Sequence, residues 1–315
     1  MEMLKVSANP HIKSGDSTRS MMFDVILALL PAATAAVIIF GLRSLLVMAV
    51  CIITAVLSEF ICRKLMKREN TIGDLSAVVT ALLLAFNLPV TIPLWQAAIG
   101  SAVAIVVVKQ MFGGIGCNFV NPALIGRIVL MNSFATSMST WAMPVAYQVD
   151  GADVVTGATP LALLSKGEKL PSLMDMFLGQ TGGCLGETCA LALLLGGVYL
   201  VIRRVITPTI PLFFVGTVAI ISALSGGNPL YEVLSGGLLL GAIFMATDYV
   251  TSPTTFKGQI IFGIGCGLIT SFIRIFGVIP EGVSYAIIIM NILTPHIETL
   301  TRKKPFGTQK EGSGR

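Results

Sequence analysis

Apolar runs close to the length that crosses a hydrocarbon core follow one another from residue 21 to residue 294. Hydrophobic residues make up 54% of the chain and charged residues 12%, which leaves too little polar surface for a soluble globule. We therefore predict an all-α polytopic membrane protein. About ten spans are expected, at roughly 21–41, 44–62, 74–90, 94–110, 118–132, 188–202, 209–224, 233–249, 260–276 and 282–294.

Basic residues are distributed unevenly between these spans. If the first segment is cytoplasmic, sixteen of the 21 lysine and arginine residues lie on the cytoplasmic side and three on the other, while Arg127 and Arg274 fall within spans. Membrane proteins retain basic residues in the cytoplasm, so this count predicts that both chain ends are cytoplasmic. The formal net charge of +5 therefore follows the membrane and does not indicate a nucleic-acid partner.

The predicted order of segments is simple. A cytoplasmic N-terminal segment (1–20) precedes a first membrane repeat (21–132), an extracytoplasmic loop (133–183), a second membrane repeat (184–299) and a cytoplasmic tail (300–315). No small-residue cleavage site ends the first apolar run, so we expect a retained helix and not a cleaved signal.

Two pairs of similar segments suggest that the second repeat is an inverted copy of the first. "LSAVVTALLLAFNLPVTIP" (75–93) resembles "SGGLLLGAIFMATDYVTSP" (235–253), and "NFVNPALIGR" (118–127) more faintly resembles "NILTPHIETL" (291–300). Each pair is five spans apart, an odd number, so the copies cross the membrane in opposite senses. Broken spans at matching positions of two halves indicate a site near the midplane. The alternative is that small residues only allow close helix packing.

Ionisable side chains inside predicted spans are candidates for an ion path. Asp248 lies in the polar break "ATDYVTSP", where freed backbone carbonyls could join its carboxylate around a cation. Asp74 begins a span. Its alternative role is that of a carboxylate at a helix N-terminus, which the helix dipole favours. Glu187 in "GGCLGETC" could hold an ion or a cofactor, or cap its helix. For Asp24 and Glu59, near span ends, we expect positions at the lipid headgroups.

Cysteines and glycines indicate neither a metal site nor a nucleotide loop. The six cysteines are scattered without CxxC spacing and should pack as small hydrophobic residues. The glycine clusters 112–126 and 179–187 lack the GxxxxGK[ST] lysine, so their glycines should allow helix breaks and close backbone approach.

The stretch "GADVVTGATPLALL" (151–164) lies in the predicted outer loop. Pro160 disfavours the α conformation at Thr159, so we expect Thr159 to be extended with its hydroxyl displayed. Gly157 and Ala158 should leave room beside it. A threonine hydroxyl can carry a phosphate ester, but the residues alone favour an ordinary turn.

Five segments, in order, resemble one known family. They are "GDLSAVVTALLLAFNLP", "KQMFGGIGCNFVNPALIGR", "DVVTGATPL", "GGCLGETC" and "MATDYVTSP". "TGAT" is similar to the Ser/Thr-Gly-Ala-Thr flavinylation motif of RnfD, the D-type membrane component of the Rnf complex, and of the related NqrB component of the Na⁺-translocating NADH:quinone reductase. The first motif position is Thr156, where many members have serine.

The resemblance implies a function and a cofactor. FMN would be joined through its phosphate to Thr159 by a flavin transferase, and a non-covalent riboflavin would lie near the membrane helices. The chain would be a membrane component of a ferredoxin:NAD oxidoreductase in a bacterial or archaeal cell membrane, coupling electron flow to Na⁺ or H⁺ movement. Its partners would be the Rnf components of the C, G, E, A and B types. A stand-alone secondary transporter or channel and a cofactor-free structural component are the alternatives.

Overall fold

The computed structural model describes residues 17–144, 157–277 and 281–302. The regular elements of these ranges are helices, and every predicted apolar segment contains one. Large apolar side chains such as those of Ile38 and Leu212 are exposed, as lipid-facing residues must be. Four helices are long and apolar enough to cross a membrane on their own: α1 (Thr18–Phe40), α2 (Leu42–Leu65), α13 (Phe256–Phe276) and α14 (Val283–Thr301). The chain is an all-α polytopic membrane protein.

The remaining apolar helices are shorter, and two of them end in π-helical turns. In the first half these are α3 (Ser76–Phe86), α4 (Leu94–Val103) with its continuation η2 (Ala104–Gln110), and α5 (Pro122–Ser133). In the second half they are α9 (Ala190–Ile202), α10 (Thr209–Leu224), and α12 (Leu238–Leu240) with its continuation η4 (Gly241–Met245). Short helices join them: η1 (Ile72–Asp74), α6 (Ala135–Met138), α7 (Pro160–Lys166), α8 (Leu173–Leu178) and α11 (Pro229–Leu234).

The two halves use the same packing scheme. Helix α2 packs against α3 and α4, and its counterpart α10 packs against η4 and α13. Contacts between α4 and α5 are repeated between α13 and α14. The first helices of the halves, α1 and α9, pack on each other, and so do the fifth helices, α5 and α14. Glycine allows the first of these approaches, because a Cβ atom at Gly196 would collide with the carbonyl oxygen of Ala28.

Helix α3 and the α12–η4 segment run in opposite directions through the centre of the molecule. A Cβ atom at Gly237, just before α12, would lie 4.0 Å from Asn87 Oδ1, just after α3. At their other ends, Ser76 at the start of α3 and Thr247 after η4 line one cavity. This antiparallel pair, which we name the antiparallel centre, agrees with the inverted repeat predicted from residues 75–93 and 235–253.

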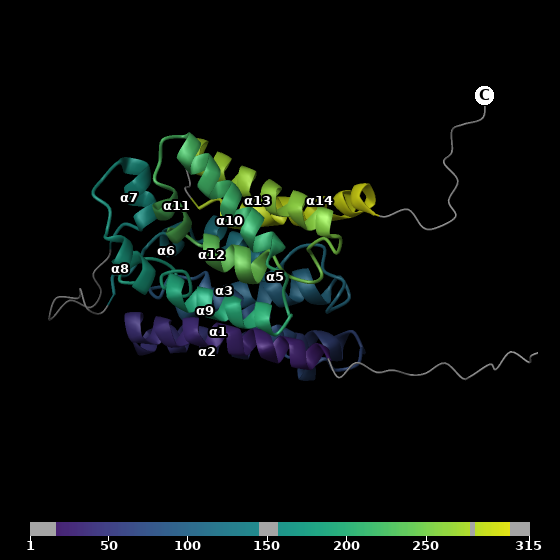
Figure 1. Ribbon diagram of the computed structural model, residues 1–315. Coiled ribbons are helices and arrows are strands. Elements are labelled where there is room, and N and C mark those ends of the chain that lie inside the picture. Colours follow the sequence, from purple (N-terminus) through teal and green to yellow (C-terminus); the bar gives the residue numbers. More distant parts are fainter. Residues whose placement is uncertain (1–16, 145–156, 278–280, 303–315) are drawn as a thin grey trace, which may run out of the picture.

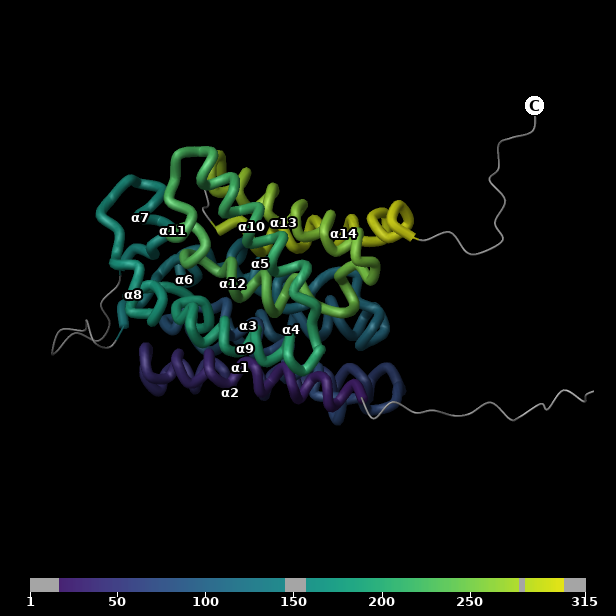
Figure 2. Tube along the Cα trace, viewed as in Figure 1, coloured from purple at the N-terminus to yellow at the C-terminus, as the bar shows by residue number. Residues whose placement is uncertain are grey.

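The described chain begins and ends on the same side of the helical bundle. Helix α1 begins and α14 ends at one end of the long helices, which we name the terminal end, and α7 and α8 lie at the other, which we name the α7 end (Figures 1 and 2). The segment 133–183 was predicted as a loop, but its described parts contain the short helices α6, α7 and α8. Cap signals explain two of these helices: Thr159 caps α7, and Ser172 caps α8 through the Asp175 N–H at 3.1 Å.

Candidate functional site

Thr159 begins α7 and is held in place by its own side chain. Its backbone is extended, with φ −69° and ψ 153°, as the following proline predicts. Its Oγ1 accepts a hydrogen bond from the Ala162 N–H at 3.2 Å, and the residue is 7% exposed. The prediction of a displayed hydroxyl was therefore wrong, because the side chain turns back to cap the helix.

The residues before Thr159 are tightly placed. The Gly157 N–H donates to the carbonyl oxygen of Trp141 at 3.1 Å. A Cβ atom at Gly157 would lie 2.5 Å from Met143 Sδ, so Met143 occupies the room that the sequence was expected to leave there. Ala158 is exposed, so the position immediately before Thr159 is accessible to solvent. Thr156 lies outside the described residues.

A buried arginine of α5 connects the two halves, because it binds residues at the end of α3 and at the start of α14. Arg127 of α5 is 3% exposed. Its guanidinium forms an ion pair with Glu281 and donates to Asn87 Oδ1 at 2.8 Å and to Ser284 Oγ at 3.0 Å. Asn87 follows α3, whereas Glu281 and Ser284 lie at the start of α14. Arg127 thus joins the end of α3 in the first half to the start of α14 in the second half.

Glu187 adds a second carboxylate beside this arginine. Its Oε1 accepts a hydrogen bond from the Cys184 N–H at 3.1 Å. Its Oε2 is buried without a hydrogen-bond partner among the described residues. A Cβ atom at Gly237 would lie 3.1 Å from this oxygen and 3.7 Å from Arg127 Nη1. Because α9 has Cys189 at its N-cap, Glu187 closes a turn and does not cap that helix.

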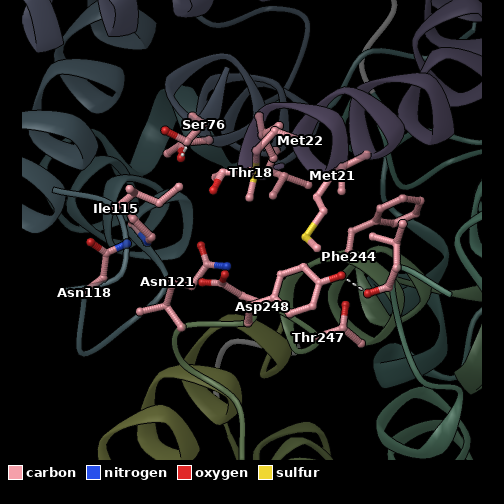
Figure 3. A pocket seen from close by; sticks show the side chains of 18 of the residues that line it. Thr18, Met21, Met22, Ser76, Ile115, Asn118, Asn121, Phe244, Thr247 and Asp248 are labelled. Carbon is pink, nitrogen blue, oxygen red and sulfur yellow. Dashed lines mark hydrogen bonds between the residues drawn. The ribbon is translucent and has the colours of Figure 1, made fainter. Parts of the chain in front are cut away.

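A cavity of about 360 Å³ lies at the terminal end, between the two halves. Figure 3 shows Ser76 and Thr18 on one side of the hollow, with Asn121 and Asp248 on the other. The rest of the wall is mostly apolar: Met21, Met22, Val25, Val79, Leu83, Leu200 and Phe244. Asn118 also lines the cavity, and its buried Oδ1 has no hydrogen-bond partner among the described residues. This size and polarity are typical of sites for small organic ligands.

Two predicted carboxylates lie near this cavity. Asp248 follows η4 in the predicted polar break and lines the cavity, and its Oδ2 accepts a hydrogen bond from Thr251 Oγ1 at 3.3 Å. Asp74 ends η1 and accepts from the Ser76 N–H at 2.8 Å, which is the contact of a carboxylate at a helix start. The structure therefore does not bring the three predicted ion-path residues together, because Glu187 lies toward the α7 end.

Glu59 does not face the lipid headgroups, because its side chain points into the protein. It is 0% exposed and forms an ion pair with Lys109 of η2, Nζ to Oε2 3.0 Å. Asp24 does lie near a helix end, where it pairs with Arg203 at 3.2 Å, and the Arg203 side chain is 56% exposed. Lys109 is one of the sixteen basic residues that the sequence prediction counted on the cytoplasmic side. Its place inside the apolar run "AIVVVKQMF" was the signal that could have identified it.

Comparisons with known proteins agree with the motifs. The chain matches the NQR2, RnfD, RnfE family over residues 5–307. It is 50% identical to the D component of the Na⁺-translocating ferredoxin:NAD⁺ oxidoreductase complex of Acetobacterium woodii, over 98% of this chain and 96% of that protein. It is 42% identical to the D component of the proton-translocating ferredoxin:NAD⁺ oxidoreductase complex of Clostridium ljungdahlii, over 97% of this chain and 96% of that protein.

A third relative extends the match beyond these two bacteria. The D component of the ion-translocating oxidoreductase complex of Stutzerimonas stutzeri is 37% identical, over 94% of each chain. Identities of this size along nearly the whole length include the antiparallel centre, the cavity and the α7 end alike. The chain belongs to the NQR2, RnfD, RnfE family.

Proposed function

We propose that the chain is the D component of an ion-translocating ferredoxin:NAD⁺ oxidoreductase complex. The observation that carries this proposal is the 50% identity to a protein of that name along 98% of the chain. The inverted halves around buried charges support it, because discontinuous helices at the junction of two repeats are typical of ion-handling membrane proteins. The chain acts as one part of a multi-subunit complex, with electron input and NAD⁺ reduction on its partners.

Thr159 is the proposed attachment residue for FMN, by a phosphoester that a flavin transferase forms. The geometry fits, because Thr159 Oγ1 accepts the Ala162 N–H and donates no hydrogen bond within the described ranges. Esterification removes a hydroxyl proton that no described residue accepts, and it leaves Oγ1 a lone pair for the helix cap. A bound flavin supplies one- and two-electron chemistry. The role of Thr156, Gly157 and Ala158 is to present Thr159 to the transferase.

The cavity at the terminal end fits the second, non-covalent flavin, riboflavin, that the family resemblance implies. Asn118 Oδ1 needs a donor, and Asn121 lies beside it on the cavity wall. Apolar side chains such as those of Met22, Leu83 and Phe244 would pack against an aromatic ring system. These residues would orient the ring and exclude water from it.

The proposed ion path follows the antiparallel centre. Asp248 and Asp74 stand near its terminal end and Glu187 near its α7 end, separated by roughly 15 Å, the length of α3. Negative charge added within the cavity strengthens the attraction of this low-dielectric region for a cation. The relatives are named for Na⁺ and for protons, and carboxylates with neighbouring hydroxyl and carbonyl oxygens accept either cation.

The proposed orientation has both chain ends in the cytoplasm and the α7 end outside. The start of α1 and the end of α14 lie at the same end of the bundle, which supports an even number of crossings (Figure 1). The basic residues Arg63, Lys64, Arg203 and Arg204 end helices that return to the terminal end, as the positive-inside rule requires. Thr159 would then receive its flavin on the extracytoplasmic side.

Covalent flavin is tested by in-gel fluorescence. The chain, made together with a flavin transferase and denatured, should give a fluorescent band that Thr159→Ala abolishes. Ser165→Ala removes another hydroxyl, on the exposed side of α7, so it serves as the matched control and should keep the band. A non-fluorescent wild-type chain from its own host would refute the attachment, and Thr156→Ala tests whether the first motif position is needed for recognition.

A further inference from the structure

A buried cluster of oxygen atoms at the cavity wall has no role in the function proposed above. It is built by Glu59 of α2, Ser76 of α3, Thr71 and the neighbouring pair Lys109–Gln110 of η2. Glu59 and Gln110 are 0% exposed and Lys109 is 2% exposed. Lys109 and Ser76 also line the cavity, so the cluster reaches the cavity wall through these two residues.

Lys109 is the cation that these oxygens now hold. Its Nζ lies 3.0 Å from Glu59 Oε2 and 2.6 Å from Ser76 Oγ. The other carboxylate oxygen, Glu59 Oε1, accepts from Gln110 Nε2 at 2.9 Å and from Thr71 Oγ1 at 2.8 Å. A lysine side chain this deeply buried is stable only while it is paired. The cluster is therefore a set of oxygen ligands that already stabilises one monovalent cation.

A second observation indicates that the cluster can take a free cation. The Gln110 amide donates to Glu59, but its own oxygen, Oε1, is buried without a hydrogen-bond partner among the described residues. A buried carbonyl oxygen without a partner is costly. Carboxylate, amide and hydroxyl oxygens together are the ligands that hard cations prefer.

The π-helical turn explains why two consecutive residues reach one carboxylate. In an α-helix, neighbours point about 100° apart, whereas the wider π-turn changes this spacing and is often found at functional sites. Here η2 brings both Lys109 Nζ and Gln110 Nε2 to Glu59. Gln110 and Lys109 thus contact different oxygen atoms of the Glu59 carboxylate, Oε1 and Oε2.

We propose that Glu59, Gln110, Thr71 and Ser76 form a binding site for a monovalent cation, Na⁺ or H⁺, which Lys109 occupies and closes in the resting state. Lys109 and the free cation exclude each other. A negative charge gained in the cavity draws the Lys109 ammonium toward it, and a cation replaces Lys109 at Glu59, so the total charge stays balanced. The inference rests on the proposed redox-driven transport, and its experiment needs no electron transfer.

Cation binding to the oxidised, purified complex tests the site directly. Lys109→Met removes the internal cation, and we expect the variant complex to bind one more ²²Na⁺ than wild type in equilibrium dialysis. Adding Glu59→Gln should return binding to the wild-type value. If the cation is a proton, Lys109→Met should instead show a protonated-carboxyl band in its infrared spectrum that Glu59→Gln removes.

Arg203→Met is the matched control, because it also takes a cation from a carboxylate. The Arg203 side chain is 56% exposed, so water can replace it at Asp24 and no additional Na⁺ should be retained. An assembled Lys109→Met complex with neither an extra Na⁺ nor a protonated carboxyl would overturn the proposal. Loss of electron transfer alone would count against the proposed function and not against this site.

A second variant covers the case in which Lys109→Met fails to assemble. Lys109→Arg keeps Glu59 paired through a guanidinium, which binds a carboxylate by two parallel hydrogen bonds and is displaced less readily. The cation concentration for half-maximal transport by the reconstituted complex should rise by about tenfold. An unchanged half-saturation concentration in an assembled, active complex would equally overturn the proposal.

Discussion

Replacing Arg127 by methionine should weaken the contact between the two halves and lower the free energy of unfolding. The guanidinium is 3% exposed and binds Glu281, Asn87 and Ser284, which lie on both sides of the antiparallel centre. Methionine retains most of the volume but none of the donors. Glu281, which is 13% exposed, is then left without its counter-ion, and Glu187 loses the positive charge of Arg127 beside Gly237.

The structure sets the size of the effect. Removing one partner of a buried ion pair costs about 3–5 kcal/mol, mainly because the remaining charge is unpaired. The hydrogen bonds to Asn87 and Ser284 belong to the same loss and are not added to it. Neutralising the stranded carboxylate should recover part of this cost. We therefore expect an Arg127→Met/Glu281→Gln double variant to be more stable than Arg127→Met alone, with an interaction energy of about 2–3 kcal/mol.

Equilibrium unfolding of the chain in mixed detergent micelles measures this cycle. Wild type, both single variants and the double variant are compared at one detergent composition. Arg274→Met is the matched comparison, because Arg274 is also 3% exposed but pairs with Glu232 within one half. Additive single-variant effects, with an interaction energy near zero, would refute the idea that Arg127 stabilises the centre through Glu281.

The remaining predictions concern the ion path and the packing around it. Asp248→Asn should impair cation transport by the reconstituted complex while leaving flavin fluorescence of the chain unchanged, and equal transport in vesicles would remove Asp248 from the path. Gly186→Ala should lower the free energy of unfolding by about 1–3 kcal/mol, because its Cβ atom would collide with Phe86 Cβ at the end of α3. Gly216→Ala, where the structure leaves open space, is the control for this substitution.

Features encoded over short stretches of sequence were predictable. Each predicted apolar run contains a helix of the structure, and the breaks after 86 and 245 followed from polar residues and proline that the two halves share. The extended backbone of Thr159 followed from Pro160. Its role as a helix cap was also readable, because threonine followed by proline at the first helical position is a typical helix start.

Contacts between distant residues could not be predicted in the same way. Glu59 and Lys109 are fifty positions apart, and their pairing depends on the packing of α2 against η2 and on a π-turn that no propensity indicates. Arg127 was recognised as an intramembrane charge, but its partner Glu281 lies 154 residues away, just before α14. A single sequence gives the presence of such charges, whereas their pairing arises from tertiary structure.

We propose above that this chain carries electrons whose transfer drives a cation across the membrane. This proposal is tested most directly in vesicles that contain the whole complex, by adding reduced ferredoxin and NAD⁺ and measuring cation uptake. The wild-type complex should take up cation as NAD⁺ is reduced, and Thr159→Ala should abolish both processes in an assembled complex. Cation uptake at the wild-type rate with Thr159→Ala would contradict the account.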